Sequence, residues 1–152
     1  TADLELTNVY PWEDLIKLKI QESAENYLET ILMLAKEQPY VRSIDIATEL
    51  GFSKPSVSVA MKKLRESGYV EMNRDGRITL LPPGEEVAAR IYERHRLLTD
   101  FFVRLGVDPE VAAADACKVE HDLSEETFCR IKEHVYRQPG ADAPAPGSRP
   151  ER

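Results

Sequence analysis

Apolar residues recur at helical spacing along most of the chain. The first strong run follows Ser23, which can cap a helix, and Pro39 marks its end. Its apolar positions are Tyr27, Leu28, Ile31, Leu32 and Leu34. In residues 1–22 the pattern is weaker, and only Pro11 and Trp12 indicate the start of a short amphipathic segment. We therefore expect a helix from Ser23, preceded by an extension of unassigned role.

Two shorter helices are predicted next, with a tight turn between them. The first runs from Ser43, a favourable cap, to Leu50, and Gly51 can supply the left-handed residue that ends it. The second runs from Lys54 to Ser67, and its apolar face carries Val57, Ala60, Met61 and Leu64. Two helices joined in this way predict a helix-turn-helix.

After Gly68 the apolar pattern no longer has a helical period. Residues 69–72 and 77–80 are typical of short strands, and the turn between them ends in Asp75-Gly76, a pair that favours hairpins. A hairpin directly after a helix-turn-helix predicts a winged helix.

The C-terminal half is predicted to be helical throughout. Turn and cap signals delimit helices at about Glu85–Leu105, Pro109–His121 and Ser124–Tyr136, and Asp108 is the expected cap of the second of these. The sequence thus predicts a mainly α fold: a winged helix-turn-helix domain with a small β-hairpin wing at 23–82, then an all-α domain at 83–138. Residues 139–152 are rich in Pro, Ala and Gly, which predicts a disordered tail.

Composition and charge narrow the functional classes. The chain is 42% apolar and 31% charged and has no apolar run that could span a membrane, so a soluble cytoplasmic protein is expected. A net charge of −7 argues against uniform coating of nucleic acid. Residues 40–80, however, carry seven Lys and Arg against five acids, and residues 53–65 carry four cations and no acid. This polarity predicts a local cationic face.

The basic segment has the composition of a DNA recognition helix. Hydroxyl groups at its start can donate to phosphates or base edges, a proline can contact a thymine methyl, and lysines can lie along the backbone. A solvated helix face with a helix-start proline would explain the residue types, but not the turn and the wing that accompany them. The candidate DNA contacts are Arg42, Ser43, Ser53, Lys54, Pro55, Ser56, Ser58, Lys62, Lys63, Arg74 and Arg77.

A second group of residues indicates metal chemistry. Cys117, Glu120 and His121 share one helix face, so a thiolate, a carboxylate and an imidazole can converge on one ion. His95, together with Asn26 and Glu29, could complete the site if the first helix packs nearby. The alternative is a buried thiol beside a solvated Glu-His pair. Of the remaining residues with possible chemistry, we expect Cys129 in the core and His134 in solvent.

Taken together, these motifs resemble the iron- and manganese-dependent transcriptional repressors of the diphtheria toxin repressor and manganese transport regulator type. The resemblance spans about Ser23 to Val135 and rests on residues 23–31, 53–58, 94–98 and 117–121. It implies a winged helix joined to a metal-binding and dimerisation domain, and a homodimer that binds a palindromic operator in double-stranded DNA. Fe(II) or Mn(II) would be the co-repressor.

Carried over by position, the resemblance implies a primary site formed by Asn26, Cys117, Glu120 and His121. A second ion, as in the manganese branch, would use Glu29 and His95 and share Glu120, which gives one or two ions per subunit. Asn26 matches neither branch, Glu29 matches the manganese branch, and Cys117 matches the iron branch. Because a soft thiolate favours later transition metals, Fe(II) is expected in preference to Mn(II).

Two other functional classes remain open at this stage. A helical metalloenzyme would bring Glu and His together, but this chain lacks the paired Glu-x-x-His repeats of di-metal bundles. A winged-helix regulator that needs no metal would reduce Cys117, Glu120 and His121 to structural residues.

Overall fold

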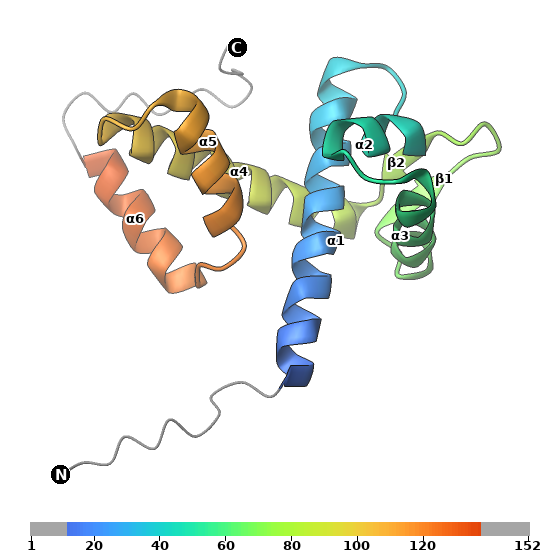
Figure 1. The fold of residues 1–152 in the computed structure, drawn as a ribbon, viewed down its shortest axis with the longest axis horizontal. Helices are drawn as coiled ribbons and strands as arrows, with labels where there is room; N and C mark the ends of the chain where they lie inside the picture. Colours follow the sequence, from blue (N-terminus) through green and yellow to red (C-terminus); the bar gives the residue numbers. More distant parts are fainter. Residues whose placement is uncertain (1–11, 138–152) are drawn as a thin grey trace. The chain divides into compact units, whose positions relative to one another are not determined.

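The computed structural model describes residues 12–137, with side chains from residue 21 onward (Figure 1). Six helices and one two-stranded sheet are found there: α1 (Trp12–Glu37), α2 (Ser43–Leu50), α3 (Lys54–Glu66), β1 (Val70–Met72), β2 (Ile78–Leu80), α4 (Pro82–Arg104), α5 (Pro109–Val119) and α6 (Glu125–Arg137). The predicted mainly α fold, with a winged helix followed by a helical domain, is confirmed. The chain divides into two compact units, with the boundary inside α4 after Tyr92.

Helix α1 is longer than predicted. It begins at Trp12, so Ser23 lies exposed inside the helix and the prediction that it caps a helix is wrong. Residues 12–37 contain neither glycine nor proline, and nothing in that run interrupts the helix. The expected extension at 1–22 therefore includes the first turns of α1. Its first eleven residues, and the predicted tail at 139–152, lie outside the described residues.

The helix-turn-helix follows the predicted turn chemistry, with one correction. Gly51 has φ 68°, the left-handed conformation that ends α2. Arg42, and not Ser43, occupies the cap position of α2, and its N–H donates to Asp45 Oδ2 at 2.8 Å. Ser53 caps α3, because its Oγ accepts from the Ser56 N–H at 3.3 Å.

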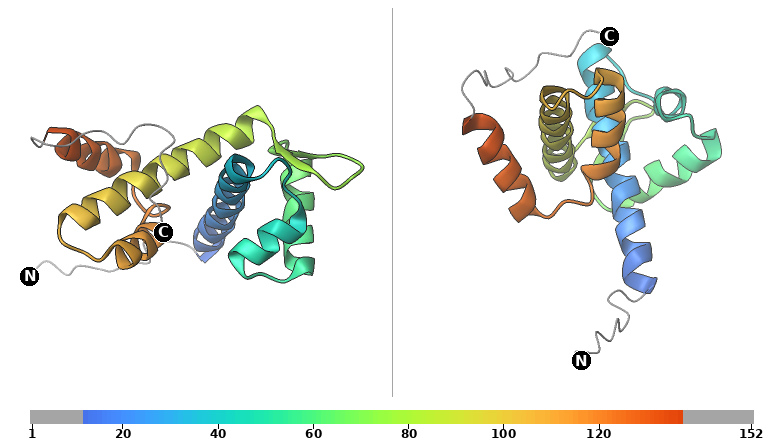
Figure 2. Two further views of the ribbon diagram at one scale, coloured as in Figure 1. Left: turned by 90° about the horizontal axis from the view of Figure 1, so that it is seen from above. Right: turned by 60° about the vertical axis from the view of Figure 1, so that its left-hand side comes forward.

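The wing is a short antiparallel hairpin that projects from the helices of the first unit (Figure 2). Val70 pairs with Leu80, and Met72 pairs with Ile78. The Ile78 N–H donates to the Val41 carbonyl at 2.7 Å, so the wing is attached to the loop that precedes α2. The core beneath it is apolar and includes Leu28, Ile31, Ile46, Val57, Met61 and Ala88.

The second unit packs α5 and α6 with the C-terminal part of α4. Leu97, Phe128 and Val135 are buried, and Phe101 and Ile131 pack against them. Asp108 caps α5 as expected, accepting from the Glu110 and Val111 N–H groups. The predicted core position of Cys129 is wrong, because this residue lies on the exposed face of α6. Among the described residues, no helix is both long enough and apolar enough to cross a membrane.

Candidate metal centre and nucleic-acid interface

Three of the predicted metal ligands meet in the second unit. Glu120 immediately follows α5 and is completely buried. His95 Nδ1, from α4, lies 2.8 Å from Glu120 Oε2, and His121 Nε2 lies 3.3 Å from Glu120 Oε1. The His121 side chain is also buried, at 2% exposed. The structure thus places one carboxylate between two imidazoles.

The electrostatics of Glu120 reflect these two neighbours. Burial raises the pKa of the Glu120 carboxyl, because a charge is costly away from water. Close contacts with His121 and His95, which favour the charged form, outweigh that effect, so the pKa of Glu120 is lowered. The carboxylate is therefore ionised under physiological conditions, as a metal ligand must be.

The donor set fits a divalent transition metal. Carboxylate oxygen and imidazole nitrogen are common ligands of such ions. Within the described part of the chain, Glu120 Oε1 is buried without a well-formed hydrogen bond, despite its proximity to His121. Buried polar atoms normally have a partner, so this oxygen is available as a ligand atom.

The remaining predicted ligands lie on α1 and α5. Asn26 and Glu29 are one turn apart on α1, in the first unit, where Glu29 is buried and Asn26 is half-buried. Cys117 is exposed on α5, one turn before Glu120, so it is not the buried thiol of the alternative interpretation. The described structure therefore groups His95, Glu120 and His121 within the second unit, which also contains Cys117, whereas Asn26 and Glu29 belong to the first unit.

The predicted recognition helix presents its polar residues to solvent. Val57, Met61 and Leu64 are buried on the opposite face of α3. The exposed set is Ser53, Lys54, Pro55, Ser56, Ser58, Lys62 and Lys63. The Ser53 hydroxyl donates to Ser56 Oγ at 2.8 Å, which orders the first turn of α3. A rigid cationic helix face of this kind can enter a DNA groove.

The wing carries Arg77, which the sequence predicted as a DNA contact only because of its charge. The Arg77 guanidinium carbon lies 3.5 Å from the centre of the Tyr40 ring. Asn73 Oδ1 accepts from the N–H groups of Asp75 and Arg77, which shapes the turn of the wing. Arg74 is exposed in that turn. Tyr40 was not among the predicted DNA contacts, because nothing in the local pattern signals its stacking on Arg77.

The remaining two candidates flank the start of α2. Arg42 is exposed and Ser43 is half-buried. Both lie in the first unit, as do α3 and the wing. All eleven predicted DNA contacts therefore belong to one unit.

Both parts of the chain match described families. Residues 19–77 match the iron dependent repressor, N-terminal DNA binding domain, and residues 82–138 match the iron dependent repressor, metal binding and dimerisation domain. A relative from Salmonella typhimurium, "Transcriptional regulator MntR", is 37% identical over 108 residues, which are 71% of this chain and 69% of the relative.

Solved structures show the same similarity. The T. acidophilum IdeR structure superposes with a TM-score of 0.67 at 27% identity, covering 74% of this chain and 53% of that one. A structure described as a manganese-dependent transcriptional repressor in complex with manganese has a TM-score of 0.67 at 32% identity, with 73% and 51% covered. The chain thus spans about half the length of these two solved proteins.

Proposed function

We propose, from the fact that this chain belongs to the iron-dependent repressor family, that it is a transcriptional repressor whose binding to DNA is promoted by a divalent metal ion. Family membership establishes a metal-dependent regulator of transcription and excludes an enzyme. The observation that carries the specific proposal is the buried Glu120 carboxylate between His95 and His121, within the domain that matches a metal-binding family.

The proposed ligand set extends beyond these three side chains. Asn26 and Cys117 join Glu120 and His121 at a primary site, and Glu29 joins His95 and Glu120 at a second. This assignment is supported by the burial of Glu29 and by the position of Cys117 one turn before Glu120. The proposal thus gives each subunit one or two ions.

The mechanism follows from where these ligands lie in the chain. Asn26 and Glu29 belong to the unit that carries α3, whereas the other ligands belong to the second unit. Ligands from both units around one ion would favour the arrangement of recognition helices that fits an operator. Without the ion, repulsion between the acidic ligands would oppose that arrangement.

The choice between Fe(II) and Mn(II) depends on Cys117. A thiolate ligand favours Fe(II) over Mn(II), since affinity for soft donors rises along the first transition row. The names of the matched relatives and of one solved structure point instead to manganese. We propose Fe(II) as the preferred ion if Cys117 is a ligand, and Mn(II) if it is not.

We further propose that the functional form is a homodimer bound to a palindromic operator in double-stranded DNA. The second unit exposes Val103, Leu105 and Val111 at the end of α4 and the start of α5. These side chains can pack against a second copy of the chain. A two-fold dimer would place two α3 helices on two half-sites, which is why a palindrome is expected.

A metal series tests the proposal. The metal-free protein is prepared without oxygen, and its binding to a duplex from its own promoter is measured at fixed salt with Fe(II), Mn(II), Zn(II) or chelator. Binding that requires Fe(II) or Mn(II) and is lost in His121→Ala supports the proposal. Equal binding with and without metal would favour a regulator that needs no metal. A scrambled duplex of equal length controls for binding without sequence preference.

A further inference from the structure

Arg94 is a buried cation next to a proposed ligand. It directly precedes His95 on α4 and is only 6% exposed. A buried guanidinium is costly unless its N–H groups find acceptors. Arg94 Nη1 donates to the Glu120 carbonyl at 3.1 Å and to the Leu123 carbonyl at 2.7 Å. Its Nη2 donates to Glu125 Oε2 at 2.7 Å.

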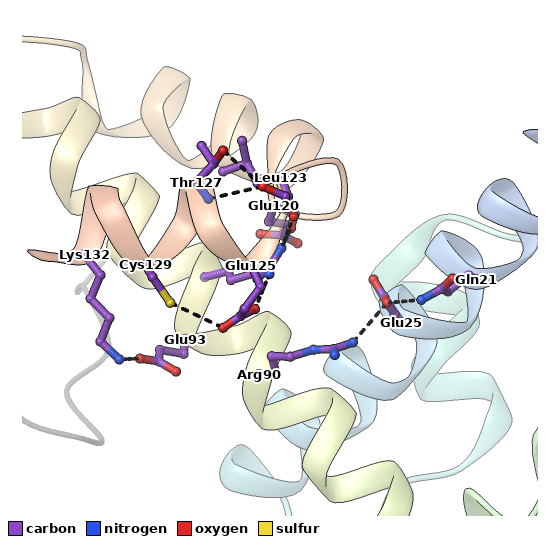
Figure 3. Close-up of polar contacts among 12 residues, drawn as sticks. Gln21, Glu25, Arg90, Glu93, Glu120, Leu123, Glu125, Thr127, Cys129 and Lys132 are labelled. Carbon is purple, nitrogen blue, oxygen red and sulfur yellow. Dashed lines mark hydrogen bonds and ion pairs between the residues drawn. The ribbon is translucent and has the colours of Figure 1, made fainter. Parts of the chain in front are cut away.

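All three acceptors lie within residues 120–125, which are the turn between α5 and α6 and the first residue of α6 (Figure 3). Carbonyls at the end of a helix have no partner within that helix. Glu120 occupies this position at the end of α5, and Arg94 supplies the hydrogen bond to its carbonyl. The Phe128 ring, 5.0 Å from the guanidinium carbon, covers the charge from the α6 side.

The ion pair with Glu125 does not by itself explain this arrangement. The Glu125 side chain is 69% exposed, and exposed ion pairs contribute little. The two carbonyl contacts are the buried ones, and both hold main-chain atoms of the turn. Arg94 therefore acts mainly on the position of that turn.

We propose that Arg94 is a positioning residue for the metal centre. It holds the main chain of Glu120 at a set distance from α4, and so directs the Glu120 carboxylate toward His95, the next residue along α4. This inference rests on the proposed function, because it concerns the geometry of the same site. Groups that orient metal ligands commonly change metal affinity by about 10–100-fold when removed.

The test uses Co(II) chloride as the probe, because the visible spectrum of bound Co(II) reports on coordination geometry. Arg94→Met removes the donors and keeps an unbranched apolar stem. We expect it to weaken Co(II) binding by about 10–100-fold and to alter the spectrum. Arg94→Lys keeps the charge but cannot reproduce the planar fork, so a smaller change in the same direction is expected. Arg104→Met is the matched control on the same helix, where Arg104 pairs with Asp100, and it should leave both readouts unchanged.

The outcomes separate the inference from the function on which it rests. Failure of the wild-type chain to bind Co(II) would contradict the proposed function. Wild-type affinity and spectrum in a folded Arg94→Met protein would overturn the positioning role alone. If that variant does not fold, Arg94→Lys is judged by the same two readouts. If neither folds, Arg94→Leu, which removes every donor with a smaller side chain, is judged by the same two readouts.

Discussion

His95 Nδ1 and Glu120 Oε2 lie 2.8 Å apart, although 25 residues separate them in the chain. Together with His121 they form the buried donor group of the second unit. We expect Glu120→Gln to weaken Mn(II) or Fe(II) binding by more than the roughly 10–100-fold typical of supporting groups, because the change removes an ionised ligand. Titration calorimetry without oxygen measures this. Glu110→Gln, which changes an exposed acid on α5, is the control. Equal metal affinity in Glu120→Gln and Glu110→Gln would contradict the assignment of Glu120 as a ligand.

The lowered pKa of Glu120 makes a prediction for the metal-free protein. Contacts with His121 and His95 outweigh the effect of burial, so the folded-state pKa lies below the ordinary value of 4.5. A group of this kind stabilises the fold above its unfolded pKa, and that stability is lost as the pH falls through the folded pKa. Urea unfolding in chelator from pH 7 to pH 3 should therefore show a weaker loss of stability on acidification in Glu120→Gln than in wild type. Parallel pH profiles for the two proteins would contradict this.

The stacking of Arg77 on Tyr40 predicts a contribution of the wing to DNA affinity. Arg77→Gln should weaken binding and reduce the slope of log K against log salt by about 1, as expected for one lost phosphate contact. Tyr40→Leu keeps the charge and removes the stacking, worth about 0.5–1 kcal/mol at an exposed site, so a smaller loss with an unchanged slope is expected. Fluorescence anisotropy over a salt series measures both. Arg137→Gln removes an exposed charge from α6, and an equal effect there would show that Arg77 acts only through net charge.

Ser53 combines two roles that substitutions can separate. Ser53→Ala should lower the free energy of unfolding by about 1 kcal/mol, because the Ser56 N–H loses its cap. Ser53→Asp retains a good cap but places a negative charge where α3 would meet phosphate. We therefore expect Ser53→Asp to have a free energy of unfolding close to that of wild type but a weaker affinity for DNA. Wild-type DNA affinity in Ser53→Asp would show that this end of α3 does not contact DNA.

Gly84 is required by close packing within the first unit. A Cβ at this position would lie 2.1 Å from the Tyr69 carbonyl oxygen, which is main chain and cannot rotate away. Gly84→Ala should therefore destabilise the fold by about 1–3 kcal/mol despite the better helix propensity of alanine. Thermal unfolding measures this loss of stability. Glu85→Ala, at an exposed neighbouring position, is the control and should unfold like wild type.

Structural features that depend on only a few neighbouring residues could be predicted from the sequence. The left-handed Gly51, the Asp108 cap and the hairpin turn before Arg77 are features of this kind, and the structure places each as expected. The beginning of α1 was predicted too late. Residues before Ser23 have a weak apolar pattern, yet they lack any residue that would end a helix.

Interactions between distant segments could not be obtained from spacing alone. The sequence proposed His95 and Glu120 as ligands, but their contact depends on how α4 packs against the end of α5. The role of Arg94 could not be predicted, since its main-chain acceptors lie 26 and 29 residues away in the chain. The exposure of Cys129 was missed for a similar reason, because α6 buries Phe128 and turns the next residue outward.

Metal binding and DNA binding are expected to strengthen each other, and a measurement of reciprocity tests this most directly. The Mn(II) and Fe(II) dissociation constants are measured with and without the promoter duplex, and the DNA dissociation constant with and without saturating metal. Linkage requires the duplex to tighten metal binding by the same factor by which metal tightens DNA binding. Equal factors, well above one, are the predicted result. A metal affinity unchanged by the duplex would contradict the claim.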